Sequence, residues 1–281
     1  KLSFRIIKPD AEEERQGLER ELFSRMDERF LDAPAFALEQ VYSYARRMAE
    51  LVQESLVTAS HTLFAYDKCR AKEVERLEQL VDRYDDEISG YLVKLSARNL
   101  SETDSKRLNM LLHSVGDLER ISDHAINLTD CAGIMDEKKL DFSEKATEEL
   151  RIFSQAVGDL VQASVDVFGT ENVEAARCIE PFEETIDVLQ KEMKRRHMKR
   201  LKKGKCTAEL GFILSDITNN YERIADHCSN LAINVMQLYE DDTHAHEYID
   251  SLERGAGSAF DNLLQEYLRH YELPGKKTGK L

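Results

Sequence analysis

The sequence predicts an all-α protein made of two pseudo-symmetric three-helix bundles and an extra C-terminal helix. Helix breakers are rare, since the 281 residues include only 4 Pro and 12 Gly, and apolar residues recur at helical spacing along most of the chain. One segment also occurs twice, as LERISDHAINL at 118–128 and YERIADHCSNL at 221–231. A repeated segment of this kind indicates a duplicated helical unit.

The first half of the chain divides into a lead-in and one repeat. Residues 1–34 are charged and are interpreted as a lead-in segment with a short helix around 11–26. The first repeat, residues 35–138, is predicted to contain three helices, at about 35–68, 71–95 and 101–135. Ser101 with Asp104 three residues later is typical of a helix start, because the serine side chain caps the first turn.

The second half repeats this order over residues 139–242. Its helices are predicted at about 143–170, 171–203 and 207–240, with Ser143 at the first start. Pro181 is expected to kink the middle helix, and Gly204 is expected to end it after a basic last turn. Residues 243–281 are predicted to form a helix over about 246–271 and a frayed tail.

The duplication extends to all three helices of each repeat. The segment LEQLVDRY at 77–84 aligns with FEETIDVL at 182–189, and LVQESL at 51–56 aligns with LVQASV at 160–165. Small differences between the offsets are expected from loops of different length. Each helix of one half therefore has a counterpart in the other half.

The repeated segment carries polar residues that suit a metal site. Residues four apart lie on one helix face, so Glu119, Asp123 and Asn127 project together, as do their copies Glu222, Asp226 and Asn230. The second helix of each repeat adds its own acidic pair, and paired carboxylates repel one another unless a cation lies between them. These second-helix pairs are Glu78/Asp82 and Glu183/Asp187.

Other residues of the repeated segment are given supporting roles. His124 and His227 are expected beside the carboxylates rather than as certain ligands, and Arg120 and Arg223 are expected to pair with neighbouring acids. Any single acidic pair on so charged a chain is ordinary for a solvated helix face. The basic run KRRHMKRLKKGK at 194–205 fits either an anion or partner surface or a solvated helix end.

Composition excludes several classes of protein. The net charge of −15 argues against general binding to DNA or RNA backbones and is compatible with cation binding. No apolar run is long enough to span a membrane, although a chain that starts at Lys1 is expected to be a piece of something longer. We expect no enzymatic activity, because the sequence lacks a phosphate-binding loop, a zinc-protease motif and a nucleophile with an evident base.

These residues resemble the PhoU family of phosphate-uptake regulators, over about residues 35–240. The doubled E-R-I-x-D-H-x-x-N motif and the second-helix E-x-x-x-D pairs carry the resemblance. The resemblance implies two three-helix bundles with multinuclear metal clusters, which would contain iron, zinc, nickel, magnesium or manganese. The implied ligands are Glu78, Asp82, Glu119, Asp123, Glu183, Asp187, Glu222 and Asp226, with His124, His227, Asn127, Asn230, Arg120 and Arg223 beside them.

A finer similarity is to PhoU-like domains at the C-terminus of bacterial sodium/phosphate cotransporters, carried by LDAPAFALEQ at 31–40 and by the second repeat from Arg195 to His227. It implies a regulatory domain on the cytoplasmic side of the inner membrane. Its partner would be the membrane part of the same polypeptide or another phosphate transporter, with inorganic phosphate and homo-oligomer formation as further expectations.

Two alternatives to the cotransporter domain are kept. One is a stand-alone PhoU-type adaptor of a phosphate ABC transporter and its sensor kinase. The other is a carboxylate-bridged di-metal oxidase, which the absence of an accompanying E-x-x-H motif disfavours.

Overall fold

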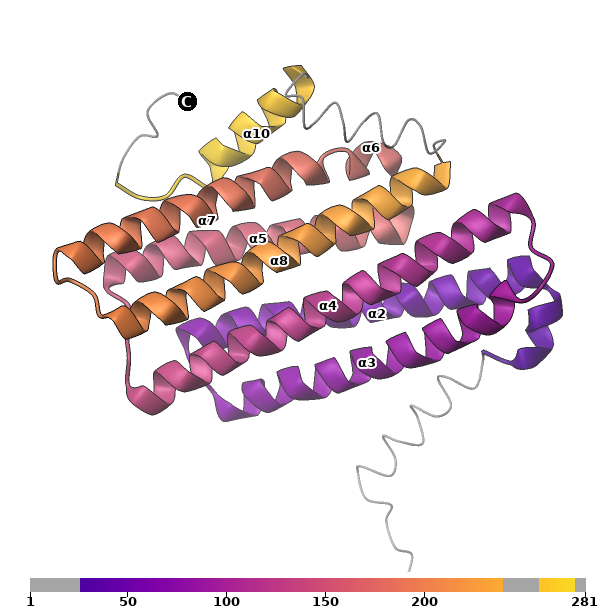
Figure 1. The fold of residues 1–281 in the computed structure, drawn as a ribbon, viewed down its shortest axis with the longest axis horizontal. Helices are drawn as coiled ribbons and strands as arrows, with labels where there is room; N and C mark the ends of the chain where they lie inside the picture. The colour runs from indigo at the N-terminus through magenta and orange to yellow at the C-terminus, as the bar shows by residue number, and fades with distance from the viewer. Residues whose placement is uncertain (1–25, 240–257, 276–281) are drawn as a thin grey trace, which may run out of the picture.

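Every regular element in the described part of the chain, residues 26–239 and 258–275 of the computed structural model, is a helix (Figure 1). None of the helices in these ranges combines the length and the apolar character that a bilayer crossing needs. The elements are η1 (Glu28–Asp32), α2 (Pro34–Phe64), α3 (Lys68–Ser96), α4 (Glu102–Lys138), α5 (Glu144–Thr170), α6 (Val173–Ala176), α7 (Ile179–Lys202), α8 (Ala208–Tyr239) and α10 (Ser258–His270).

The helix starts follow the local chemistry of the chain. The Ser101 side chain accepts a hydrogen bond from the backbone N–H of Asp104, and Ser143 does the same for Ala146, so both predicted starts are confirmed. Asp67 caps α3 in the same way, which places that start slightly earlier than predicted.

The expectation of one kinked helix over 171–203 is wrong. The segment divides into α6 and α7, and Pro181 lies in the first turn of α7. Proline has no N–H to donate and its ring clashes with the carbonyl four residues earlier, so it kinks or breaks a helix in the interior but is accommodated in the first turn. The break at Arg177 and Cys178 thus replaces the kink.

The predicted end of α7 at Gly204 is confirmed. Gly204 has a φ of +64°, a left-handed conformation that glycine adopts without strain. Its N–H donates to the carbonyl of Leu201, and the N–H of Lys205 donates to the carbonyl of Arg200. This pair of bonds satisfies two carbonyls of the last turn and fixes where the basic segment turns toward α8.

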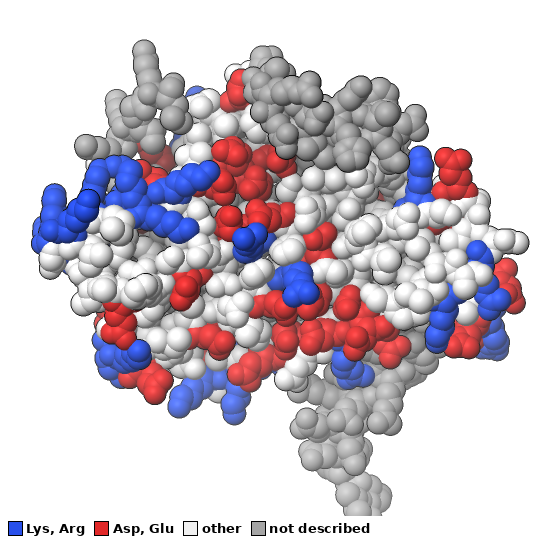
Figure 2. Space-filling model, viewed as in Figure 1, with Lys and Arg blue, Asp and Glu red and all other residues white. Residues whose placement is uncertain are grey.

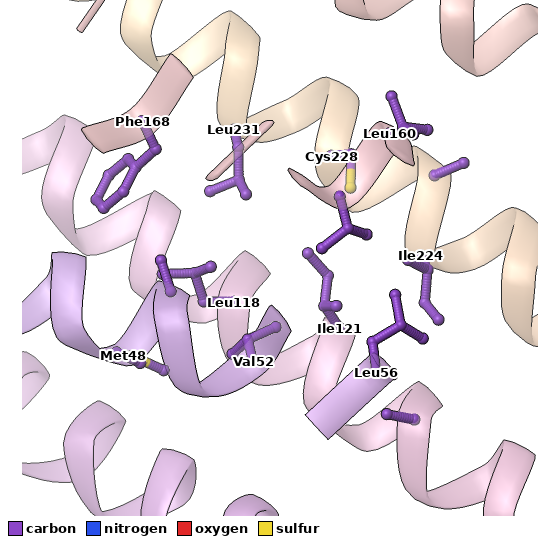
Figure 3. Close-up of a cluster of buried hydrophobic side chains, with 14 of the residues drawn as sticks. Met48, Val52, Leu56, Leu118, Ile121, Leu160, Phe168, Ile224, Cys228 and Leu231 are labelled. Atoms are coloured by element: carbon purple, nitrogen blue, oxygen red, sulfur yellow. The ribbon is translucent and has the colours of Figure 1, made fainter. Parts of the chain in front are cut away.

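The two halves share one core. Helices α2, α3 and α4 pack together, as do α5, α7 and α8, and the halves meet where α4 lies along α8 and α2 along α5 (Figure 1). Figure 3 shows buried apolar side chains from these central helices gathered in one cluster, including Met48, Ile121, Leu160 and Ile224. The amides of the aligned pair Gln53 and Gln162 also bond to each other, so equivalent residues meet across the pseudo-symmetry axis.

The C-terminal helix packs on the second half. Phe182 of α7 stacks on Tyr267 and Tyr271, with ring centroids 4.3 Å and 5.5 Å apart. The Tyr271 hydroxyl also donates to Asp159 of α5 at 2.7 Å. The helix predicted at 11–26 and the first part of the one predicted at 246–271 lie outside the described residues, and the domain boundaries stay assignments from the sequence.

Candidate metal centre

The predicted ligands lie on two helix pairs. Those of the first half come from α3 and α4, which pack along each other, and those of the second half come from α7 and α8, which also pack together. Acidic side chains gather over both pairs in Figure 2, where they form two red areas with white and blue surface between them. The fold therefore brings each motif to the second-helix acidic pair of its own repeat.

The first half contains a compact carboxylate cluster. Oxygen atoms of Glu78, Asp82 and Asp123 all lie within 4.8 Å of one another, and these three are called the α3–α4 trio below. Burial, followed by repulsion from neighbouring acids, raises the pKa values of Glu78 and Asp82. Such an arrangement favours a bound cation, because a cation replaces mutual repulsion with attraction.

Glu119 lies next to the trio but is engaged elsewhere. Its carboxylate is 3.3 Å from Nε of Arg120, which also approaches Asp123 at 3.6 Å. Burial raises the pKa of Glu119, and Asp123 and Asp85 raise it further while Arg120 opposes them. The charges of the trio thus act on Glu119, but Glu119 does not contribute an oxygen to the cluster of ligand atoms.

The second half is acidic but less compact. Burial, then Glu180 and Asp187, raise the pKa of Glu183 to about 8. Burial also raises the pKa of Glu222, and repulsion from Asp226 raises it further. Among the described residues, no three ligand atoms of this half come together as they do in the trio.

A lysine accounts for part of this difference between the halves. Lys191 donates to Asp187 at 2.8 Å and so neutralises one of the predicted ligands. In the alignment of the second helices, Lys191 corresponds to Asp86, which adds repulsion to Asp82 in the first half. The aligned position therefore carries opposite charge in the two repeats. Its negative charge favours cation binding in the first repeat, and its positive charge opposes cation binding in the second.

The motif histidine and asparagine of the first repeat reach across to the second repeat. Nδ1 of His124 lies 2.8 Å from Oδ1 of Asn220 on α8, and the amide of Asn127 donates to the same oxygen at 3.1 Å. Burial lowers the pKa of His124, which favours its neutral form. These side chains help to hold α4 against α8.

The second repeat makes the reciprocal contacts. Nδ1 of His227 lies 2.8 Å from Oδ1 of Asp117 on α4, and Asn230 donates to that oxygen at 3.0 Å. Asp117 and Asn220 occupy equivalent positions in the two repeats. The rings of His124 and His227 stack between them, with centroids 5.9 Å apart and an interplanar angle of 28°.

The motif arginines pair with acids of their own helix, as the sequence suggested. Arg223 lies 3.7 Å from Glu222 and 3.2 Å from Asp226, which repeats the contacts of Arg120 in the first half. Both arginine side chains are more than half exposed. They thus offset part of the acidic charge at the surface rather than in the interior.

Sequence reasoning missed several residues around these clusters. Asp85 follows Asp82 by one helical turn on α3 and is half-buried, and Glu180 precedes Glu183 by one turn on α7 and accepts from Ser229. The helical spacing of both was visible in the sequence. Asp117 could also have been found, because it precedes the first motif at the position that Asn220 occupies before the second.

The donor set defines the chemistry that the α3–α4 trio could support. Its donors are all carboxylate oxygens, which suit hard cations such as magnesium, manganese and calcium, and also iron. His124 and His227, which would extend the range to zinc or nickel, use Nδ1 to bind the opposite repeat. The trio fits a cation-binding role.

Comparison with known families gives one match over most of both repeats. The family model for the PhoU domain matches residues 45–132 and 150–235. The chain is 27% identical over 214 residues to the phosphate-specific transport system accessory protein PhoU homolog 1 of Thermotoga maritima, covering 76% of this chain and 91% of the relative. It is 27% identical over 213 residues to the corresponding PhoU homolog of Aquifex aeolicus, covering 75% and 95%.

Solved structures show the same helical arrangement. The crystal structure of PhoU from Pseudomonas aeruginosa superposes with a TM-score of 0.67 at 25% identity, over 72% of this chain and 96% of that one. The phosphate transport system regulatory protein PhoU from Streptococcus pneumoniae gives a TM-score of 0.66 at 19% identity, over 73% and 96%. The second similarity supports the fold alone.

Proposed function

The chain belongs to the PhoU domain family, and from that premise we propose that it is a metal-binding regulator of phosphate transport rather than an enzyme. The names of the relatives support this role, since both are described as accessory proteins of phosphate-specific transport systems. The all-helical fold and a carboxylate cluster that suits cation binding fit a regulatory role as well.

The relatives favour the adaptor form of this function. Both are PhoU homologs of transport systems, and this chain covers nearly their whole length. The expectation of a domain fused to a sodium/phosphate cotransporter receives no support from these comparisons and remains a prediction from the sequence. We therefore propose an accessory protein that acts on a separate phosphate transporter.

The observation that carries the metal-binding part is the α3–α4 trio. Glu78 and Asp82 would hold the ion from α3, and Asp123 would hold it from α4. A bound divalent cation supplies positive charge that offsets the crowded carboxylates. Because the three oxygens come from two helices, a bound ion would link α3 to α4 and restrict the motion of one helix relative to the other.

An experiment in cells tests the regulatory part. The gene is deleted and then restored either as wild type or as the triple variant Glu78→Gln/Asp82→Asn/Asp123→Asn, and phosphate uptake is measured in phosphate-rich and phosphate-poor medium. We expect deletion to uncouple uptake from phosphate supply and the triple variant to restore coupling only in part. A variant with three exposed acids replaced elsewhere, Glu50→Gln/Glu54→Gln/Glu137→Gln, is the matched control.

The outcomes separate the two parts of the proposal. Unchanged uptake control in the deletion strain would contradict the regulatory role. Full restoration by the triple variant, at the same protein level as the control, would leave the regulatory role intact and contradict its dependence on the trio.

A further inference from the structure

We propose that the C-terminal end of α7 forms a second binding site, for a phosphoanion that carries several negative charges. The site is a cleft between α7, the start of α5 and the segment that follows α10. In Figure 2 this end of α7 is the largest blue area on the visible face of an otherwise acidic protein. The proposal is independent of the acidic clusters and of the function proposed above.

Two arginines of the cleft, Arg196 and Arg200, are held in place by one buried acid. Glu149 is only 1% exposed, and its two oxygens accept from Arg196 at 2.9 Å and from Arg200 at 2.7 Å. Arg196 also donates to the carbonyl of Pro274 at 2.7 Å, which joins the C-terminal segment to the cleft wall. A guanidinium fixed in this way loses little further entropy when it binds a ligand.

Arg200 has donors that the protein leaves unsatisfied. Its Nε and Nη2 atoms are buried and have no hydrogen-bond partner among the described residues. A buried charged donor without an acceptor is destabilising, and proteins rarely retain one without a reason. Arg200 lines the cleft, so an anion bound there would lie beside the residue whose donors lack acceptors.

Four lysines add positive charge to the cleft without a salt bridge to any acid in the described part of the chain. Lys145, Lys199, Lys203 and Lys205 line the cleft, and none forms a salt bridge within the described ranges. Three of them lie in or just after the last turn of α7, where the helix dipole favours cations. That preference explains single lysines at a helix end, but it does not explain the buried Glu149 or the cleft.

The composition of the cleft indicates the class of ligand. Seven cationic side chains line it against two carboxylates, Glu149 and Glu192. Arginine forks and flexible lysines together suit phosphate oxygens, and an excess of this size suits several linked or clustered phosphate charges rather than a single orthophosphate. Such a phosphoanion could be free in solution or form the headgroup of an acidic lipid, and these sources share the same chemistry.

Calorimetric titration of the full chain with tripolyphosphate, at near-physiological salt, tests the site. The test variant is Lys199→Gln/Lys203→Gln/Lys205→Gln, which leaves the structural arginines untouched. The matched control replaces three exposed lysines of α3, Lys68→Gln/Lys72→Gln/Lys94→Gln, so that the net charge changes equally. We expect the cleft variant to bind at least about 10-fold more weakly than wild type and the control to bind within about twofold. Sedimentation with vesicles containing phosphatidylglycerol is measured on the same three proteins.

Each outcome decides the proposal. Tripolyphosphate binding that only the cleft variant loses supports a free phosphoanion, and vesicle binding that only the cleft variant loses supports a lipid headgroup. Equal weakening in the cleft and control variants would show a general charge effect and overturn the proposal. So would the absence of binding to both probes, or equally tight binding of sulfate and tripolyphosphate.

Discussion

At the scale of single residues, the repeated motif serves two purposes. Asp123 joins the α3–α4 trio, whereas His124, the next residue along the chain, bonds to Asn220 of the other repeat. Neighbouring positions on a helix point about 100° apart, so one segment can face its own repeat and the opposite repeat at once. A motif that the sequence presents as one site therefore also stabilises the contact between the halves.

The first prediction concerns the pH dependence of stability and rests on Glu192, which lines the basic cleft of α7. Hydrogen bonds from Arg195, and then from Arg196, lower the pKa of Glu192 to about 2 from its ordinary value of 4.5. A lowered pKa contributes stability that is present above about pH 4.5 and is lost as the pH falls through about 2.

We expect Glu192→Gln to lower the melting temperature at pH 7 by about 2 °C, which is roughly 1 kcal/mol in a chain of this size. We also expect it to reduce the loss of stability between pH 4.5 and 2. Thermal unfolding followed by circular dichroism measures both. The exposed Glu174→Gln on α6 is the control, and an identical pH profile for Glu192→Gln and wild type would contradict the assignment.

At the scale of helices, α3 and α7 differ more than their aligned sequences suggest. The acidic Asp86 of α3 corresponds to Lys191 of α7, and Lys191 donates a hydrogen bond to the carboxylate of Asp187. We expect the α7–α8 cluster to bind divalent cations more weakly than the α3–α4 trio, because a bound ion must first displace the lysine.

Removing that lysine should strengthen the weaker site. We predict that Lys191→Ala raises the affinity of the second binding event about fivefold, which is the effect of releasing one partly exposed ion pair. A manganese titration of wild type and variant measures this change, and the exposed Lys94→Ala on α3 is the control. No difference between the two lysine variants would mean that the lysine does not limit binding.

One acid makes several of the polar contacts between α4 and α8. Asp117 accepts from His227 and from the amides of Asn230 and Asn234. We predict that Asp117→Ala lowers the free energy of unfolding by about 1–3 kcal/mol, because these part-buried groups lose their acceptor. Urea unfolding measures the change, with the exposed Asp130→Ala on the same helix as the control. A change no larger than that of the control would show that the apolar core alone holds the halves together.

At the scale of the whole molecule, the fold was largely predictable from the sequence. Helical periodicity located the long helices, and Ser101, Ser143 and Gly204 marked ends that the structure confirms. The duplicated segments also predicted that the halves would be related. The break before Pro181 was misplaced as a kink, because periodicity alone does not distinguish a bent helix from two successive ones.

The arrangement of the acidic faces was less predictable. Helical spacing shows which residues share a face, but it does not show which face meets the other repeat. The role of Asp117 and the bonds of the two motif histidines therefore appear only once α4 and α8 are placed together. The unequal compactness of the two clusters likewise depends on where Lys191 reaches in space.

The most direct test of the central claim is a calorimetric titration of the metal-free protein with manganese. The wild type is compared with Glu78→Gln/Asp82→Asn/Asp123→Asn and with the exposed-acid control Glu50→Gln/Glu54→Gln/Glu137→Gln. We predict that the trio variant loses the tightest binding event and that the control keeps it. Tight binding of equal affinity and stoichiometry in all three proteins would contradict the assignment of the trio as a metal centre.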